Sequence, residues 1–305
     1  MPGRGNEADR VPNLMLSWSQ AVFVGVALLV LAGLLALAAA GGSPGKPATR
    51  FARWTASFAR EAAVIAFLYS AWQYAADWSI NGTAGAMVRA RWIDRTERRW
   101  HFVSEADLER PLLAHGWLGQ SANVYYATMH FTGLFVLLLW MFLRHREQYG
   151  RVRTATAIFT GVSLLIQLIP VAPPRLFGPP FVDVAAHYHL SVYDISGLST
   201  DSLSAMPSVH VGWAVIAGVA PVLYSPSRWR WAALAYPAAT IYVVVSTGNH
   251  WWLDGVAAIA ILVVIAAAQA VVLRVVQARR TVRATPAQPG PIASSRPAEL
   301  PIGTA

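Results

Sequence analysis

Two histidine-containing segments carry the residues best suited to chemistry. The first, MPSVH, places Ser208 and His210 just after Pro207, a residue that fits the first turn of a helix. Backbone N–H groups at a helix start attract anions. Ser208 could therefore bind a phosphate oxygen, and His210 could protonate a leaving oxygen. Taken alone, the segment is equally consistent with a capped helix end that carries an interfacial histidine.

The second segment, NHWWLD, places His250 and Asp254 four residues apart. At that spacing two side chains share one face of a helix. A carboxylate bonded to one ring nitrogen fixes the histidine tautomer and leaves the other nitrogen free to attack. It also stabilises the positive imidazole that attack creates. The pair is a candidate nucleophile with its orienting acid, although it could also merely tie the start of a helix together.

A third candidate is Arg175, in the proline-rich segment VAPPRLFGPP at 171–180. The prolines stiffen the backbone on both sides of it. A rigidly held guanidinium group is a suitable clamp for a phosphate. The alternative is an ordinary headgroup-contacting arginine in a loop that stops a helix.

A metal site is a competing interpretation of the same residues. His210, His250 and Asp254 could form a facial triad, with His187 and His189 as further ligands. A bound cation would be repelled by the arginine, and the serine, proline and glycine residues around the histidines suit an anion better. The chain has no cysteine, which excludes thiolate sites. We therefore expect neither a metal nor another cofactor.

Composition places the chain in a membrane. Hydrophobic residues make up 55% of the sequence and charged residues 13%, and the mean hydropathy is +0.42. The formal net charge of +9 would suggest a nucleic-acid partner for a soluble protein. Here the arginines lie between long apolar runs, as charges that flank membrane helices do. We expect lipid contact and no nucleic-acid partner.

The apolar runs predict an all-α, polytopic membrane bundle of six or seven helices. The expected spans are 14–40, 59–78, 125–143, 156–168, 211–224, 231–246 and 251–276. The second run is the weakest because it contains Glu61 and Gln73. The arginine count of the short loops puts Arg175, His210 and His250 on the extracytoplasmic face of a cell membrane, although the basic segment 84–110 on that same side argues the other way.

Segment 84–110 interleaves arginines with apolar residues, so it is either an amphipathic helix in the headgroup plane or a solvated connector. The end of the chain is rich in Pro, Ala and Ser and is expected to be disordered. The predicted organisation is a loose N-terminus, N-terminal membrane helices with the amphipathic segment, a catalytic membrane domain and a disordered tail. Their ranges are 1–13, 14–122, 123–276 and 277–305.

The order of the three motifs resembles the type-2 phosphatidic acid phosphatase (PAP2) superfamily, over roughly 125–276. That family usually has a lysine before its first arginine, a proline after it, and a second arginine six residues before the last histidine. Here the lysine is missing, Leu176 follows Arg175, and Val244 stands at the last of these positions. The APPR, MPSVH and NHWWLD forms, with NVYYATMH at 123–130, are closer to the inositol phosphorylceramide synthase-like branch, whose members move a phosphorylated headgroup between lipids.

The resemblance implies a lipid-phosphate phosphatase or phosphotransferase. His250 would attack phosphorus and become a phosphohistidine, with Asp254 orienting it. His210 would act as general acid and base, and Arg175 and Ser208 would hold the phosphate. The substrate would be a membrane lipid phosphate or phosphodiester, with water or an alcohol as acceptor. The alternatives are a non-enzymatic membrane transporter or assembly protein, favoured by histidines more than ~10 Å apart, and a metal-dependent membrane hydrolase.

Overall fold

The computed structural model describes residues 16–43, 45–79, 85–188 and 203–284. This part of the chain is all-helical, as predicted, with ten α-helices and two short 3-10 helices. The α-helices are α1 (Trp18–Ala40), α2 (Pro47–Ser79), α3 (Ala86–Arg99), α4 (Glu105–Ala114), α5 (Gly116–Arg144), α6 (Arg146–Gln167), α7 (Val184–His187), α9 (Val209–Tyr224), α10 (Ala235–Ser246) and α11 (Trp252–Ala284). The 3-10 helices are η2 (Pro174–Leu176) and η3 (Arg228–Leu234).

Three of the described helices are long and apolar enough to cross a membrane: α1, α5 and the part of α11 at Trp252–Arg279. The protein is therefore a multi-pass membrane protein. The other apolar runs lie in α2, α6 and α9 and, for the run 231–246, in the end of η3 and α10. The predicted total of six or seven spans stays a prediction. Helix α9 is apolar but has only 16 residues.

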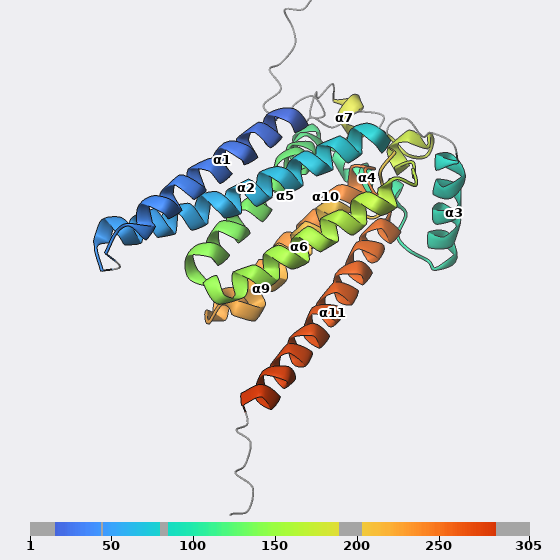
Figure 1. Cartoon of the computed structure of the whole chain (residues 1–305). Helices are drawn as coiled ribbons and strands as arrows, with labels where there is room; N and C mark the ends of the chain where they lie inside the picture. Colours follow the sequence, from blue (N-terminus) through green and yellow to red (C-terminus); the bar gives the residue numbers. More distant parts are fainter. Residues whose placement is uncertain (1–15, 44, 80–84, 189–202, 285–305) are drawn as a thin grey trace, which may run out of the picture. The chain divides into compact units, whose positions relative to one another are not determined.

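The compact unit that contains the candidate site runs from Met1 to Ile265. Its centre is formed by α5, α6, α9 and α10 (Figure 1). Phe159 of α6 is fully buried against Gly212 of α9, where a Cβ atom would overlap the phenylalanine ring. At the next position of α9, the Trp213 indole donates to Thr160 Oγ1 at 3.0 Å. These contacts fix the helix that carries MPSVH against α6.

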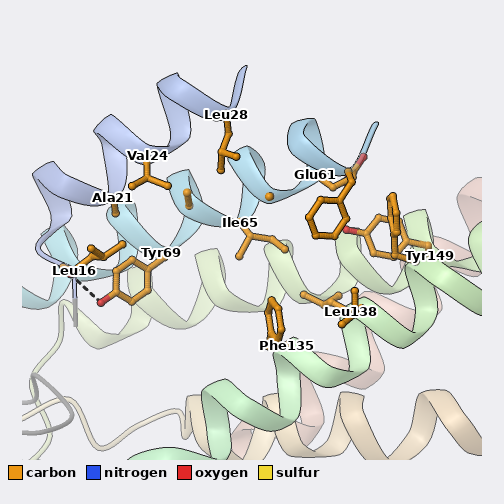
Figure 2. A pocket seen from close by; sticks show the side chains of 15 residues that line it. Leu16, Ala21, Val24, Leu28, Glu61, Ile65, Tyr69, Phe135, Leu138 and Tyr149 are labelled. Atoms are coloured by element: carbon orange, nitrogen blue, oxygen red, sulfur yellow. Dashed lines mark hydrogen bonds between the residues drawn. The ribbon is translucent and has the colours of Figure 1, made fainter. Parts of the chain in front are cut away.

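Helices α1 and α2 pack along each other beside this core. Two side chains of α2 bond to backbone at the start of α1: Tyr69 Oη donates to the Leu16 carbonyl at 3.0 Å, and Ser70 Oγ donates to the Trp18 carbonyl at 2.8 Å. Glu61 of α2 forms an ion pair with Arg153 of α6. Between these helices and α5 lies an apolar cavity (Figure 2).

The described residues of segment 84–110 contain all of α3 and the first part of α4, and neither sequence interpretation describes the segment fully. One face of α3 is exposed and carries Trp92, as expected of an interfacial helix. The opposite face is buried, and its Ile93 belongs to the same apolar cluster as Trp251 and Phe181. The segment is therefore attached to the loops that bear the candidate site.

The second compact unit, Ala266–Ala305, contains the C-terminal part of α11. The helix continues to Ala284, beyond the end that was expected at Val276. The rest of the expected tail, and the N-terminal segment 1–13, lie outside the described residues.

Candidate active site

Ser208 is the N-cap of α9, because its hydroxyl oxygen accepts the Val211 N–H at 3.3 Å. The helix therefore begins at Val209, and the expected place of Pro207 in its first turn is wrong. The Ser208 N–H donates to the Asp254 carbonyl at 3.1 Å, which joins the two histidine motifs through the backbone. Since a hydroxyl also carries a hydrogen, Ser208 can still donate to a phosphate oxygen.

His250 precedes α11, so it and Asp254 are not the helical pair that their spacing suggested. Asp254 lies in the first turn, and its Oδ2 accepts the Trp251 N–H at 2.8 Å and lies 3.3 Å from His250 Nδ1. The Ala205 carbonyl is closer to the same ring nitrogen, at 2.8 Å. Because both partners are acceptors, Nδ1 carries the hydrogen and Nε2 carries the lone pair. The tautomer that nucleophilic attack requires is thus fixed by a carbonyl as well as by the carboxylate.

The rings of His210 and His250 lie 5.5 Å apart, centroid to centroid. His210 also packs against two residues of α5: the Tyr126 ring stacks on it at 4.4 Å and the His130 ring lies at 4.3 Å. His210 Nε2 is buried with no hydrogen-bond partner among the described residues. A phosphate beside His250 would lie within reach of His210.

Arg175 lies in η2, and the turn before His250 holds it in place. Its N–H donates to the Gly248 carbonyl at 2.9 Å, and its Nε donates to Asn249 Oδ1 at 3.1 Å. Its Nη1 pairs with Asp183 Oδ2 at 3.2 Å. The guanidinium group is therefore buried and rigid, as a phosphate clamp should be, but a phosphate would have to compete with Asp183 for it.

Gly248 makes this close approach of loop and turn possible. Its φ of +66° lies in the left-handed region that favours glycine. A Cβ atom there would lie 2.8 Å from Glu109 Oε1 and 3.2 Å from Arg175 Cβ. Any larger residue would therefore displace the arginine loop from the histidine turn.

Three buried glutamates of α3 and α4, which the sequence motifs did not reveal, contact the segments around Arg175 and His250. Glu97 Oε1 accepts the Leu253 N–H at 2.7 Å and so caps the first turn of α11. Glu105 forms a hydrogen bond to the Trp252 backbone and contacts the Glu97 carboxyl group. Glu109 Oε2 accepts the Val182 N–H at 3.0 Å. All three lie in a segment in which arginines were the more conspicuous feature.

Burial controls the ionisation of these glutamates. It raises the pKa of Glu97 to about 10, and the neighbouring Glu105 contributes through a hydrogen bond and its charge. Burial likewise raises the pKa of Glu105, and it raises that of Glu109 to about 7. Glu97 and Glu105 each have one oxygen without a donor among the described residues, namely Glu97 Oε2 and Glu105 Oε1. A proton shared between the two carboxyl groups satisfies both oxygens.

The residues of the competing metal interpretation are only partly described. Within the described ranges, no three or more His, Asp or Glu side chains are arranged to hold a metal ion. His187 ends α7 with its ring against Tyr188, and His189 lies outside those ranges.

Comparison with known proteins identifies the family. No curated protein and no solved structure matches the chain. The family model of the PAP2 superfamily matches residues 91–268, which is more than half of the sequence. The match begins in α3 and ends in α11, so it contains all five predicted site residues and the three glutamates. The protein belongs to the PAP2 superfamily.

Proposed function

We propose that the protein is a membrane lipid-phosphate phosphatase or phosphotransferase that works through a phosphohistidine. The observation that carries the proposal is the 5.5 Å separation of His210 and His250, with Arg175 bonded to the turn that leads into His250. Membership of the PAP2 superfamily supports this class of reaction. A transporter or assembly protein would not require this arrangement.

In the first step, His250 Nε2 attacks phosphorus and the bond from phosphorus to the leaving oxygen breaks. His210 gives that oxygen a proton, so that an alcohol leaves rather than an alkoxide. Asp254 and the Ala205 carbonyl stabilise the charge that develops on the attacking imidazole. Arg175 and Ser208 bind the non-bridging oxygens, which is where phosphoryl transfer gains most of its stabilisation.

In the second step, water or an acceptor alcohol attacks the phosphohistidine. His210 takes the proton of the attacking hydroxyl group, and the bond from phosphorus to His250 breaks. Water gives a phosphatase and an alcohol gives a headgroup transferase. The same residues serve both outcomes, since the two differ only in which hydroxyl group reaches phosphorus.

We further propose a phosphodiester substrate, as in the inositol phosphorylceramide synthase-like branch. The chain lacks two of the cations that the PAP2 pattern usually supplies, and Asp183 pairs with Arg175. A diester carries less negative charge than a monoester, so it needs fewer cations. On this proposal the site opens on the extracytoplasmic face of a cell membrane.

The test is the His250→Ala variant. Purified protein is incubated with candidate lipid phosphates and phosphodiesters, with and without alcohol acceptors, and the products are identified by mass spectrometry. Wild-type protein should form an acid-labile phosphoprotein, and the variant should form neither that species nor product. His115→Ala, which changes an exposed histidine, is the matched control. Full activity of the His250 variant refutes the proposal, and loss of activity with a chelator would favour a metal-dependent hydrolase.

A further inference from the structure

An apolar cavity of about 370 Å³ lies between α1, α2, α5 and α6 (Figure 2). Leu28, Ile65 and Leu138 form part of its wall, and polar side chains contribute at its ends. Glu61 and Tyr149 lie together toward one end in the view, and Tyr69 lies toward the other. The cavity is therefore a slot with apolar sides within the membrane-embedded part of the protein.

A second cavity, of about 90 Å³, extends this slot toward the candidate active site. It shares Ile65, Tyr69 and Leu138 with the first cavity, so the two cavities are neighbours with a common wall. Its other wall contains Phe131 and Trp213. The rings of these two residues lie 5.6 Å apart.

These two aromatic rings connect the slot to the candidate general acid. The Phe131 ring lies 4.1 Å from the His130 ring, and Trp213 stacks on His130 at 6.1 Å. His130 in turn lies 4.3 Å from His210. A layer of packed rings, those of His130, Phe131 and Trp213, thus lies between the second cavity and His210, and His250 lies 5.5 Å from the His210 ring.

The proposed reaction places the leaving lipid alcohol next to His210. Attacking and leaving atoms lie roughly in line through phosphorus. The leaving oxygen is therefore directed away from His250 and toward His210, which protonates it. In a lipid phosphate or phosphodiester, that oxygen belongs to the lipid alcohol, so its hydrocarbon chain must extend past His210.

We propose that the slot formed by α1, α2, α5 and α6 binds the hydrocarbon chain of the lipid that leaves as the alcohol. The inference rests on the proposed function. Helices α1 and α2 lie before residue 91, where the family match begins, so their side of the slot lies outside the matched residues. The matched residues contain the proposed catalytic groups, and α1 and α2 provide one wall of the slot.

The dimensions fit a single chain. At ~30 Å³ for a small group, the larger cavity holds on the order of ten carbon groups. Along α5, the twelve helical steps from His130 to Phe142 span about 18 Å, slightly more than half of the ~30 Å hydrocarbon layer. Glu61, which is paired with Arg153, places charge at the end of the larger cavity where Tyr149 lies. The slot therefore limits the length of chain that it accepts.

Packing rather than the hydrophobic effect must provide the selectivity, because lipid tails are as apolar as the slot. A bulky residue in the wall should therefore exclude a long chain by steric overlap. Leu138 is buried and lines both cavities, whereas Val136, two residues away on α5, is 58% exposed. The two positions give a test variant and its control on the same helix.

The experiment compares Leu138→Trp with Val136→Trp on a long-chain lipid phosphate and on a short-chain, water-soluble analogue with the same headgroup. Leu138→Trp should lower kcat/KM at least tenfold for the long chain and leave the short-chain value unchanged. Val136→Trp should change neither. Leu138→Ala, which enlarges the slot, should shift the preference toward longer chains, and it tests the inference if the tryptophan variant does not fold.

Equal effects of Leu138→Trp on both substrates, or no effect on either, overturn the inference while leaving the proposed function in place. Absence of turnover of any phosphate by the wild type overturns the proposed function itself. A photoreactive group at the chain end of the long substrate should label peptides that contain Ile65 and Leu138. Equal labelling by an analogue without the phosphate would mean that the slot holds bulk lipid only, and would also overturn the inference.

Discussion

Replacing Glu97 by alanine removes the carboxyl group that accepts the Leu253 N–H at the start of α11. The same carboxyl group contacts Glu105, which bonds to the Trp252 backbone. The first turn of α11 holds Asp254, and His250 lies just before it. We expect the variant to loosen the turn that orients the nucleophile, although Glu97 itself contacts no reacting atom.

The size of the effect follows from burial. Glu97 is 3% exposed, so water cannot readily replace the lost acceptor. A buried donor left without a partner costs about 1–3 kcal/mol. If this cost appears in the barrier, kcat should fall by roughly 5- to 150-fold. KM for a short-chain soluble substrate should change little, because the phosphate clamp at Arg175 stays in place.

The Glu97→Gln variant distinguishes the hydrogen bonding of residue 97 from any role of its charge. Burial raises the pKa of Glu97 to about 10, so the carboxyl group is protonated at neutral pH, and an amide resembles it in shape and in hydrogen bonding. Glu97→Gln should therefore retain kcat and thermal stability. Glu147→Ala, at an exposed position of α6, is the matched control. The reasoning is refuted if glutamine is as damaging as alanine, or if alanine leaves both kcat and the unfolding temperature in detergent unchanged.

Three further predictions concern the surroundings of the site. Because burial raises the pKa of Glu109 from 4.5 to about 7, its neutral form stabilises the fold below pH 4.5 and that stability is lost as the pH rises through about 7. The unfolding temperature in detergent should fall over this range, and Glu109→Gln should reduce the fall; an identical pH profile would contradict the assignment. Asp183→Asn removes the ionised competitor for Arg175, so KM for a phosphate substrate should fall several-fold, whereas a rise in KM would show that Asp183 holds the arginine in its productive position. Trp251→Phe loses the hydrogen bond from the indole to the Ala172 carbonyl and should cost about 1 kcal/mol of stability; an unchanged unfolding temperature would exclude that contribution.

Sequence patterns predicted the helical class well, for a physical reason. Long uncharged runs such as those of α1 and α11 have few alternatives to a membrane helix, so their existence follows from composition. Motif residues next to helix starts are also visible in sequence, because proline, glycine and serine mark the boundaries. Ser208 is indeed the cap of its helix, although Pro207 lies outside it.

Sequence patterns could not predict the contacts between segments that are distant along the chain. The acceptor closest to His250 is the Ala205 carbonyl, and a backbone group has no signature in the sequence. The spacing of His250 and Asp254 suggested a helical pair, whereas the helix begins after the histidine. The aromatic neighbours of His210 on α5 lie in the NVYYATMH stretch, which the resemblance included without assigning them a contact.

The glutamates show why segment 84–110 was interpreted only in part. A helix that carries both arginines and tryptophans has the composition of an interfacial helix, and the exposed face of α3 agrees with that. Its acidic residues look like partners for the arginines, and Asp94 does pair with Arg98. Glu97 instead faces the protein, where the first-turn N–H groups of α11 need acceptors and no intrahelical partner exists for them. The need for these acceptors arises about 150 residues further along the chain, so no local pattern could reveal it. Burial itself raises the pKa of Glu97 and so keeps the carboxyl group protonated, with a further contribution from Glu105 beside it.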